Sequence, residues 1–194
     1  MSFLADPPAH DPDVERLYAA DRARLGYVAN YTRALAWRPA AVDAWAGLNG
    51  AVRSTMDPHR YELITLAAAR RLGSAYCSLA HGKLLRERFH DAGTVARIAK
   101  DHHDAGLDPA DAAVMDFAER VADDPNGITA ADVDVLRGHG LSDPEILDVA
   151  LAAAARCFFS TVIAAVGARP DPAYAATLDP ALVAALTPNA RTAA

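Results

Sequence analysis

The sequence has little cysteine, few aromatic residues and no block of basic residues. Cys77 and Cys157 are its two cysteines among 194 residues, so the chain cannot rely on a framework of disulfides, and a reducing compartment would keep both as thiols. Aromatic residues make up 7% of the chain, and 25 acidic residues against 19 basic ones give a net charge of -6. This charge argues against nucleic acid or anionic lipid as a partner.

Targeting and membrane-spanning patterns are also missing. The first ten residues lack the basic segment and apolar stretch of a secretory signal. The most apolar stretch, residues 146–168, is interrupted by Asp148, Arg156, Ser160 and Thr161, which is costly in a bilayer and ordinary in a buried helix. We therefore expect a cytoplasmic protein that does not bind membranes.

Alanine, leucine and valine dominate the 52% of residues that are hydrophobic, and alternating runs of β-branched residues are absent. We expect an all-α bundle of about eight helices, formed as a single domain over residues 1–194. Residues 1–10 would be an N-terminal extension. Prolines at 170, 172, 180 and 188 predict an irregular C-terminal arm over residues 170–194, with one short helix near 181–186.

Helix-start and helix-stop residues predict a hairpin in the first half of the chain. Asp57 and Pro58 begin a helix that runs through Leu72 and is apolar nearly all round, as in a buried helix. Gly73 ends it, and Ser74 caps the next helix. The two helices should pack together at the centre of the bundle.

A weak internal repeat relates residues 57–70, DPHRYELITLAAAR, to residues 143–156, DPEILDVALAAAAR. Either a duplication or the common sequence features of helices explains it. Aligning the final arginines places Asp148 opposite Glu62, whereas Cys77 and His81 meet Ile163 and Gly167. Only the first copy could therefore perform thiol chemistry.

The second helix of the hairpin carries a candidate nucleophile and base. Cys77 is the third helical residue after the Ser74 cap, where free backbone N–H groups and the helix dipole stabilise a thiolate. His81 follows four residues later on the same face, so its imidazole can reach the sulfur directly or through one water. These two residues are candidate catalytic groups.

Glu62 lies on the preceding helix and can meet His81 across the hairpin. A buried carboxylate would orient the imidazole and increase its basicity, which completes a proton relay of nucleophile, base and orienting group. The structural alternative is an ion pair between Glu62 and Arg70, Arg71 or Arg88.

This segment resembles the alkylhydroperoxidase D and carboxymuconolactone decarboxylase superfamily, in particular its uncharacterised peroxidase-related branch. The family motif is Glu, eleven residues, Cys, two residues, Cys, three residues, His. Glu62, Cys77 and His81 match three of its positions without a gap, and Ser74 stands at the first cysteine. Tyr76 also looks typical, and residues 24–39 and 131–150 resemble the same branch, so the resemblance covers most of the chain.

The resemblance implies an alkylhydroperoxidase-like bundle and a thiol oxidoreductase that reduces small hydroperoxides, without a cofactor and as a trimer or hexamer. Ser74 cannot form the local disulfide, so oxidised Cys77 would stop at sulfenic acid until an external thiol or another cysteine resolves it. Cys157 is the other cysteine, but its apolar surroundings favour a buried packing role over a resolving one.

Two alternatives stay open. The first is a lyase or hydrolase like carboxymuconolactone decarboxylase, in which His81 and Glu62 perform acid–base chemistry on a small organic substrate without a cysteine. The second is a non-enzymatic, oligomeric redox sensor or binding protein. A metal centre is not expected, because the side chains of His102 and His103 should diverge on a polar linker and a third ligand is not evident.

Overall fold

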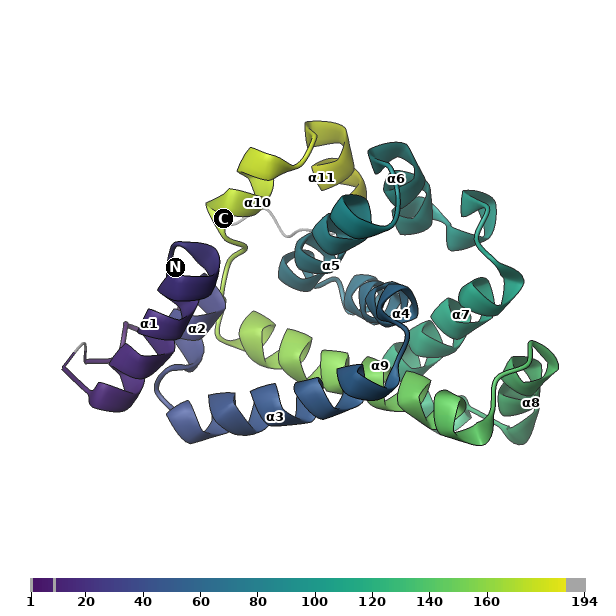
Figure 1. Cartoon of the computed structure of the whole chain (residues 1–194), viewed down its shortest axis with the longest axis horizontal. Helices are drawn as coiled ribbons and strands as arrows, with labels where there is room; N and C mark the ends of the chain where they lie inside the picture. Colours follow the sequence, from purple (N-terminus) through teal and green to yellow (C-terminus); the bar gives the residue numbers. More distant parts are fainter. Residues whose placement is uncertain (1, 9, 188–194) are drawn as a thin grey trace.

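The structure, a computed structural model, describes residues 2–8 and 10–187, and all regular elements in these ranges are helical (Figure 1). The all-α prediction is therefore confirmed. The elements are α1 (Pro12–Leu25), α2 (Asn30–Leu35), α3 (Pro39–Thr55), α4 (Pro58–Arg71), α5 (Ala75–Arg88), α6 (Ala92–Lys100), the 3-10 turn η1 (His102–Ala105), α7 (Pro109–Asp123), the 3-10 turn η2 (Pro125–Gly127), α8 (Ala130–Gly138), α9 (Asp143–Ala165), α10 (Pro172–Thr177) and α11 (Pro180–Leu186).

Aspartate–proline pairs begin many of these helices. Eight of the twelve prolines in the chain directly follow an aspartate. The carboxylates of Asp57, Asp108 and Asp179 accept hydrogen bonds from backbone N–H groups of the first turn, at 2.9, 2.8 and 2.8 Å. The proline takes a position whose N–H would have no helical partner, so the pair both caps and preorganises the helix start.

Helix α4 lies at the centre of the molecule and packs against α5, α7 and α9 (Figure 1). Leu63, Ile64 and Leu66 are completely buried, as the apolar character of this segment predicts. Gly73 has a φ of +67°, a left-handed conformation that favours glycine, and it turns the chain from α4 into α5. The predicted helical hairpin is present.

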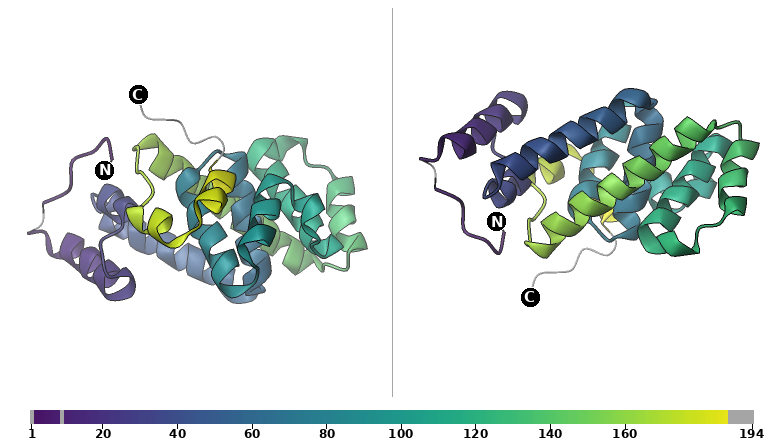
Figure 2. Two further views of the ribbon diagram at one scale, coloured as in Figure 1. Left: turned by 90° about the horizontal axis from the view of Figure 1, so that it is seen from above. Right: turned by 90° about the horizontal axis from the view of Figure 1, so that it is seen from below.

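The longest helix, α9, runs beside α3 along one side of the molecule (Figures 1 and 2). Among the described residues it is the one helix long and apolar enough to cross a membrane by length and composition. It nevertheless packs against α3, α4 and α7 and carries the buried, charged Arg156. These contacts are those of a core helix.

The C-terminal segment is more regular than the sequence predicts. Its described part forms two short helices, α10 and α11, in place of one, because two aspartate–proline pairs each begin a helix. Helix α11 packs on α5 and α6, and Leu182 and Leu186 are buried in the core. A Cβ atom added at Gly82 on α5 would lie 2.5 Å from the methyl groups of Leu186, so glycine permits this close contact. Residues 188–194 of the predicted arm lie outside the described residues.

The predicted N-terminal extension contacts two helices. The backbone N–H of Phe3 donates to the Val166 carbonyl at the end of α9, at 2.8 Å. The indole of Trp37 donates to the Ala5 carbonyl, also at 2.8 Å. The described residues of this segment are thus attached to the same side of the molecule as α2 and the end of α9.

Candidate active site around Cys77

The start of α5 places Cys77 in the first helical turn. Ser74 is the N-cap, and its hydroxyl accepts a hydrogen bond from the Cys77 backbone N–H at 3.4 Å. Cys77 is 2% exposed and packs in a cluster with Ala69, Tyr76 and Phe159. The sulfur therefore lies in a largely apolar environment at the positive end of a helix dipole.

Glu62 on α4 and His81 on α5 face each other across the hairpin. The His81 Nδ1 and Glu62 Oε2 atoms are 2.6 Å apart, and both side chains are buried. Burial, followed by the positive charge of Arg156, lowers the pKa of His81 despite the opposing effect of Glu62. The imidazole is then neutral near pH 7. If Nδ1–H donates to Glu62, Nε2 carries the free lone pair that a general base needs.

The ionic partner of Glu62 differs from the arginines considered in the sequence. Arg53 on α3 approaches the second carboxylate oxygen, at 4.0 Å, and remains half-exposed. Arg70 instead donates to the Ala185 carbonyl at 2.7 Å, and Arg71 pairs with Asp123. Glu62 is thus held between a buried histidine and a partly solvated arginine.

Arg156 on α9 is a site residue that the sequence argument did not identify. Its Nη1 donates to the Cys77 sulfur at 3.6 Å, and the guanidinium is buried. Burial alone would lower the pKa of Arg156, but the adjacent Cys77 and Tyr61 side chains outweigh this effect and raise it. Arg156 therefore places a buried positive charge and a hydrogen-bond donor beside the Cys77 sulfur. The feature of the sequence that could have identified Arg156 is its position as a single arginine within an apolar, alanine-rich helix.

One atom of Arg156 and one of a neighbouring residue have no hydrogen-bond partner within the described part of the chain. The Nε of Arg156 and the hydroxyl of Ser160, one turn further along α9, are both buried without a hydrogen bond there. Buried polar groups usually have a partner, and the exceptions often mark functional sites. Both atoms are available to hydrogen-bond a small polar molecule.

The contact expected between Cys77 and His81 is not formed as a hydrogen bond. Both residues lie on α5, four positions apart, but among the described residues the hydrogen bond to the sulfur comes from Arg156. The structure therefore joins Glu62 to His81 and Arg156 to Cys77 as two neighbouring pairs.

Aromatic side chains surround the sulfur. Trp45 stacks on Phe159 with ring centroids 5.0 Å apart, and Tyr31 packs edge-on against the same Phe159 ring at 5.4 Å. The Tyr76 hydroxyl donates a hydrogen bond to the Asp171 carboxylate. Burial raises the pKa of Tyr76, and this hydrogen bond raises it further. Tyr76 thus ties the first turn of α5 to the segment before α10 and has a structural contact as well as its place in the motif.

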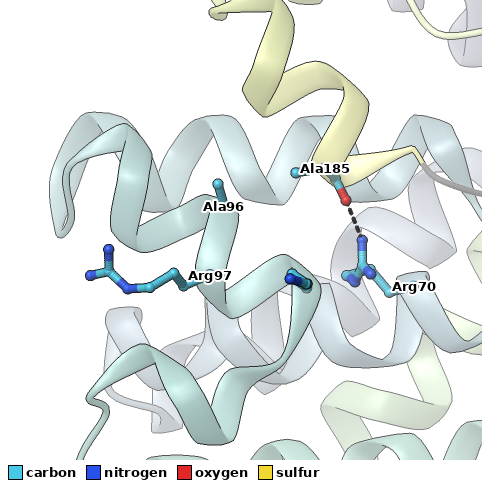
Figure 3. Close-up of a pocket in the computed structure, with 5 residues that line it drawn as sticks. Arg70, Ala96, Arg97 and Ala185 are labelled. Atoms are coloured by element: carbon cyan, nitrogen blue, oxygen red, sulfur yellow. Dashed lines mark hydrogen bonds between the residues drawn. The ribbon is translucent and has the colours of Figure 1, made fainter.

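A hollow shown in Figure 3 lies away from Cys77, between α6 and α11. It has a volume of about 480 Å³ and is lined by Arg70, Ala96, Arg97, Lys100 and Ala185. Arg70 points to the Ala185 carbonyl, whereas Arg97 extends away from it. Neither this hollow nor two others formed by described residues has Cys77, His81 or Glu62 in its wall. In this conformation the side chains of Cys77 and His81 are buried, at 2% and 7% exposed.

Two further sequence-based expectations concern Cys157 and the paired histidines. Cys157 is partly exposed on α9, and burial raises the pKa of its thiol, which makes the thiol a poor nucleophile near pH 7. The expectation that His102 and His103 diverge is wrong. Both imidazoles reach the Asp116 carboxylate, which is the third ligand-type residue that the sequence argument did not find.

Comparison with known proteins supports the fold and the family resemblance. Residues 39–120, which include Glu62, Cys77 and His81, match the model of the carboxymuconolactone decarboxylase family. No curated protein matches the sequence.

Solved structures share the fold along most of the chain. One is an alkylhydroperoxidase AhpD core, an uncharacterized peroxidase-related protein from Ralstonia eutropha JMP134, with a TM-score of 0.80, 25% identity and coverage of 89% of this chain and 94% of that one. A peroxidase-related protein from Silicibacter sp. TM1040 has a TM-score of 0.78, 24% identity and coverage of 88% and 92%. The debrominase Bmp8, in complex with 2,3,4-tribromopyrrole, has a TM-score of 0.73, 18% identity and coverage of 92% of this chain and 97% of that one. At this identity the similarity concerns the fold alone.

The family match over residues 39–120 and the fold shared along most of the chain together support the assignment of this protein to the alkylhydroperoxidase D and carboxymuconolactone decarboxylase superfamily.

Proposed function

We propose that this protein is a thiol oxidoreductase that reduces small hydroperoxides through Cys77. The observation that carries the proposal is the buried contact of 3.6 Å between the Arg156 guanidinium and the Cys77 sulfur, beside the Glu62–His81 pair. A positive charge that is removed from water interacts strongly with a nearby anion, so Arg156 can hold the sulfur when it acts as the nucleophile.

In the proposed first step, the thiolate sulfur attacks the terminal oxygen of a hydroperoxide. The S–O bond forms as the O–O bond breaks, which leaves Cys77 as a sulfenic acid and releases an alkoxide. In this proposal the neutral His81, held by Glu62, takes the thiol proton beforehand, directly or through one water, and returns it to the alkoxide, giving an alcohol. The free Nε of Arg156 offers a hydrogen bond to the peroxide oxygen.

In the second step, a small external thiol attacks the sulfenic acid and forms a mixed disulfide with loss of water. A second thiol then releases Cys77 and leaves as the external disulfide. Ser74 supports the use of an external thiol, because its hydroxyl caps α5 but cannot form a disulfide with Cys77. Small substrates are favoured, since the sulfur is enclosed by aromatic side chains.

The test is turnover of hydrogen peroxide and a small alkyl hydroperoxide with a monothiol or a dithiol as reductant. We expect thiol-dependent consumption that is abolished in Cys77→Ser, with a sulfenic acid trapped on Cys77 of the wild type. Cys157→Ser is the matched control and should retain turnover. Wild-type protein that leaves Cys77 reduced under mild peroxide would overturn the proposal. Oxidation of Cys77 without turnover would favour the redox-sensor alternative.

One observation favours a second candidate, an acid–base lyase or hydrolase acting on a small organic substrate. The Glu62–His81 pair is complete without the sulfur, and the hydrogen bond to the sulfur comes from Arg156. In such a reaction His81 would be the base and Arg156 would hold an anionic substrate group. Activity that survives Cys77→Ser but is lost in His81→Ala would select this candidate over the peroxidase.

We also propose that the protein forms a homo-oligomer in the cytoplasm, where a reducing environment would keep Cys77 available. Helix α9 leaves three large apolar side chains exposed, Leu147, Leu151 and Phe158, at spacings that place them along one side of the helix. Exposed apolar stripes of this kind commonly mark contacts between subunits.

A further inference from the structure

A second cluster of chemically reactive side chains lies at η1 and α7. The Nε2 atoms of His102 and His103 lie 2.9 and 3.0 Å from the same Asp116 oxygen. The two imidazole rings are tilted by 37° with centroids 4.4 Å apart. Two histidines on η1 thus converge with a carboxylate on α7 that lies 13 to 14 positions further along the chain.

The backbone explains why neighbouring histidines converge. Asp101 accepts a hydrogen bond from the His103 N–H at 3.0 Å and fixes the start of the 3-10 turn. His102 is buried against the body of the protein, whereas His103 is largely exposed, so His102 is the inner ring of the pair and His103 the outer one. The cluster is therefore set by the turn together with α7.

The spacing fits the coordination of a divalent ion. Zinc binds histidine nitrogen and carboxylate oxygen at about 2.0–2.2 Å, which places tetrahedral ligand atoms roughly 3.3–3.5 Å apart. Here the three ligand atoms lie within 4.8 Å of one another. Small side-chain movements, of roughly a few tenths of an ångström, would separate the two Nε2 atoms from the Asp116 oxygen enough to admit an ion. A fourth coordination position would be left for water.

The surroundings supply two further features of metal sites. The other ring nitrogen of His102, Nδ1, lies 3.8 Å from Glu119 Oε1, where a carboxylate can orient the histidine. Asp116 and His103 have side chains 48% and 57% exposed, so an ion can enter from solvent. One ligand is thus held rigidly and two are accessible.

We propose that His102, His103 and Asp116 form a binding site for a single divalent transition-metal ion, with Zn²⁺ as the preferred occupant. Glu119 is a positioning residue that acts through His102. Binding joins η1 to α7, because bonds to the ion replace the direct contacts between the two imidazole Nε2 atoms and Asp116. The proposal is independent of the chemistry at Cys77.

Calorimetric titration of the metal-free protein with Zn²⁺ tests the proposal. We expect one bound ion per chain and at least a tenfold loss of affinity in His103→Ala and in Asp116→Asn. These two side chains are exposed, so the variants should fold even if a change at the buried His102 does not. Glu119→Gln should weaken binding by about tenfold through the orientation of His102. His139→Ala, a histidine in the turn after α8, is the matched control and should bind as the wild type does.

Thiols are the main competitor for zinc, so the titration is repeated with Cys77→Ser/Cys157→Ser. Unchanged affinity is expected, and Co²⁺ bound in place of Zn²⁺ should give visible absorption without the intense band of a cobalt–thiolate bond. Affinity that is lost with the cysteines, or that is unaffected by both His103→Ala and Asp116→Asn, would overturn the site. Absence of binding to the wild type would do the same.

Discussion

The guanidinium of Arg156 on α9 lies 3.6 Å from the sulfur of Cys77 on α5, and both side chains are buried. Attraction to Cys77 and Tyr61 helps to hold Arg156 in its charged form despite its burial. Arg156 therefore depends on these neighbours, since a charged guanidinium alone would be poorly solvated at this depth.

Replacing Arg156 with Met should slow the reaction of Cys77 with hydrogen peroxide near neutral pH by about tenfold or more, because the thiolate loses its adjacent positive charge. Stopped-flow peroxide consumption under single-turnover conditions measures the rate. Arg156→Lys is the control that retains the charge and should recover part of the rate. Thermal unfolding checks the fold, and an Arg156→Met protein that is folded and as fast as the wild type would contradict the role of Arg156.

Replacing Ser74 with Cys should allow an internal disulfide with Cys77 after mild oxidation. The two residues lie one helical turn apart, and the Ser74 side chain already contacts the Cys77 backbone at 3.4 Å. A bridge would protect Cys77 from over-oxidation by excess peroxide and would be reduced by a dithiol. Intact mass and thiol counts report the bridge.

Ser74→Ala is the control for this change, because it removes the cap without adding a sulfur and should cost about 1 kcal/mol of stability. A 74–77 bridge that forms only after unfolding would show that the first turn of α5 is too rigid to close it. In that case the family's two-cysteine chemistry would need more than the missing sulfur.

Acid should destabilise the protein through His81. Its pKa is lowered in the folded chain, chiefly by burial, so the unfolded chain binds a proton more readily. Stability from this residue is therefore complete above its unfolded pKa of about 6.5 and is lost as the pH falls toward the folded pKa. The loss is up to about 1.4 kcal/mol for each pH unit in that window.

Urea unfolding of the wild type and of His81→Gln, each at about pH 7.5 and about pH 5.5, isolates this contribution. The wild type should lose more stability than the variant between the two conditions, because glutamine cannot titrate. Equal losses would mean that His81 is not buried as a neutral base.

The exposed stripe on α9 should hold subunits together. Leu147 and Leu151 lie one turn apart and are 59% and 41% exposed. Light scattering of the wild type should give a mass well above the 20.5 kDa of one chain, and Leu147→Glu/Leu151→Glu should shift it toward that value. Val135→Glu changes an equally exposed apolar residue on α8 and should leave the mass unchanged. A monomeric wild type would contradict the assembly.

Local signals explain which parts could be predicted from sequence. The α4–α5 hairpin is encoded by short-range features, namely the Asp57 cap, the left-handed Gly73 and the Ser74 cap, so its position and the approach of Glu62 to His81 could be inferred.

Contacts between distant segments could not be inferred in the same way. Arg156 and Cys77 are separated by 79 positions, and their meeting depends on how α9 crosses the hairpin. The convergence of His102 and His103 depends equally on where α7 presents Asp116. Leu48 on α3 shows a second limit, because it is apolar and nevertheless 50% exposed. Periodicity identifies an apolar side of a helix but does not say whether this chain or another one covers it.

The aspartate–proline pairs that begin the helices also set the chemical durability of the backbone. In hot dilute acid, the carboxyl group of an aspartate attacks its own peptide carbonyl, and the tertiary nitrogen of a following proline leaves more readily than an ordinary amide nitrogen. The bonds after Asp57, Asp108 and Asp143 lie at helix starts, so acid would cut this chain between helices. The fragment from Pro58 to Asp108 would carry α4 to η1 with the whole candidate motif, while Arg156 would depart on another fragment.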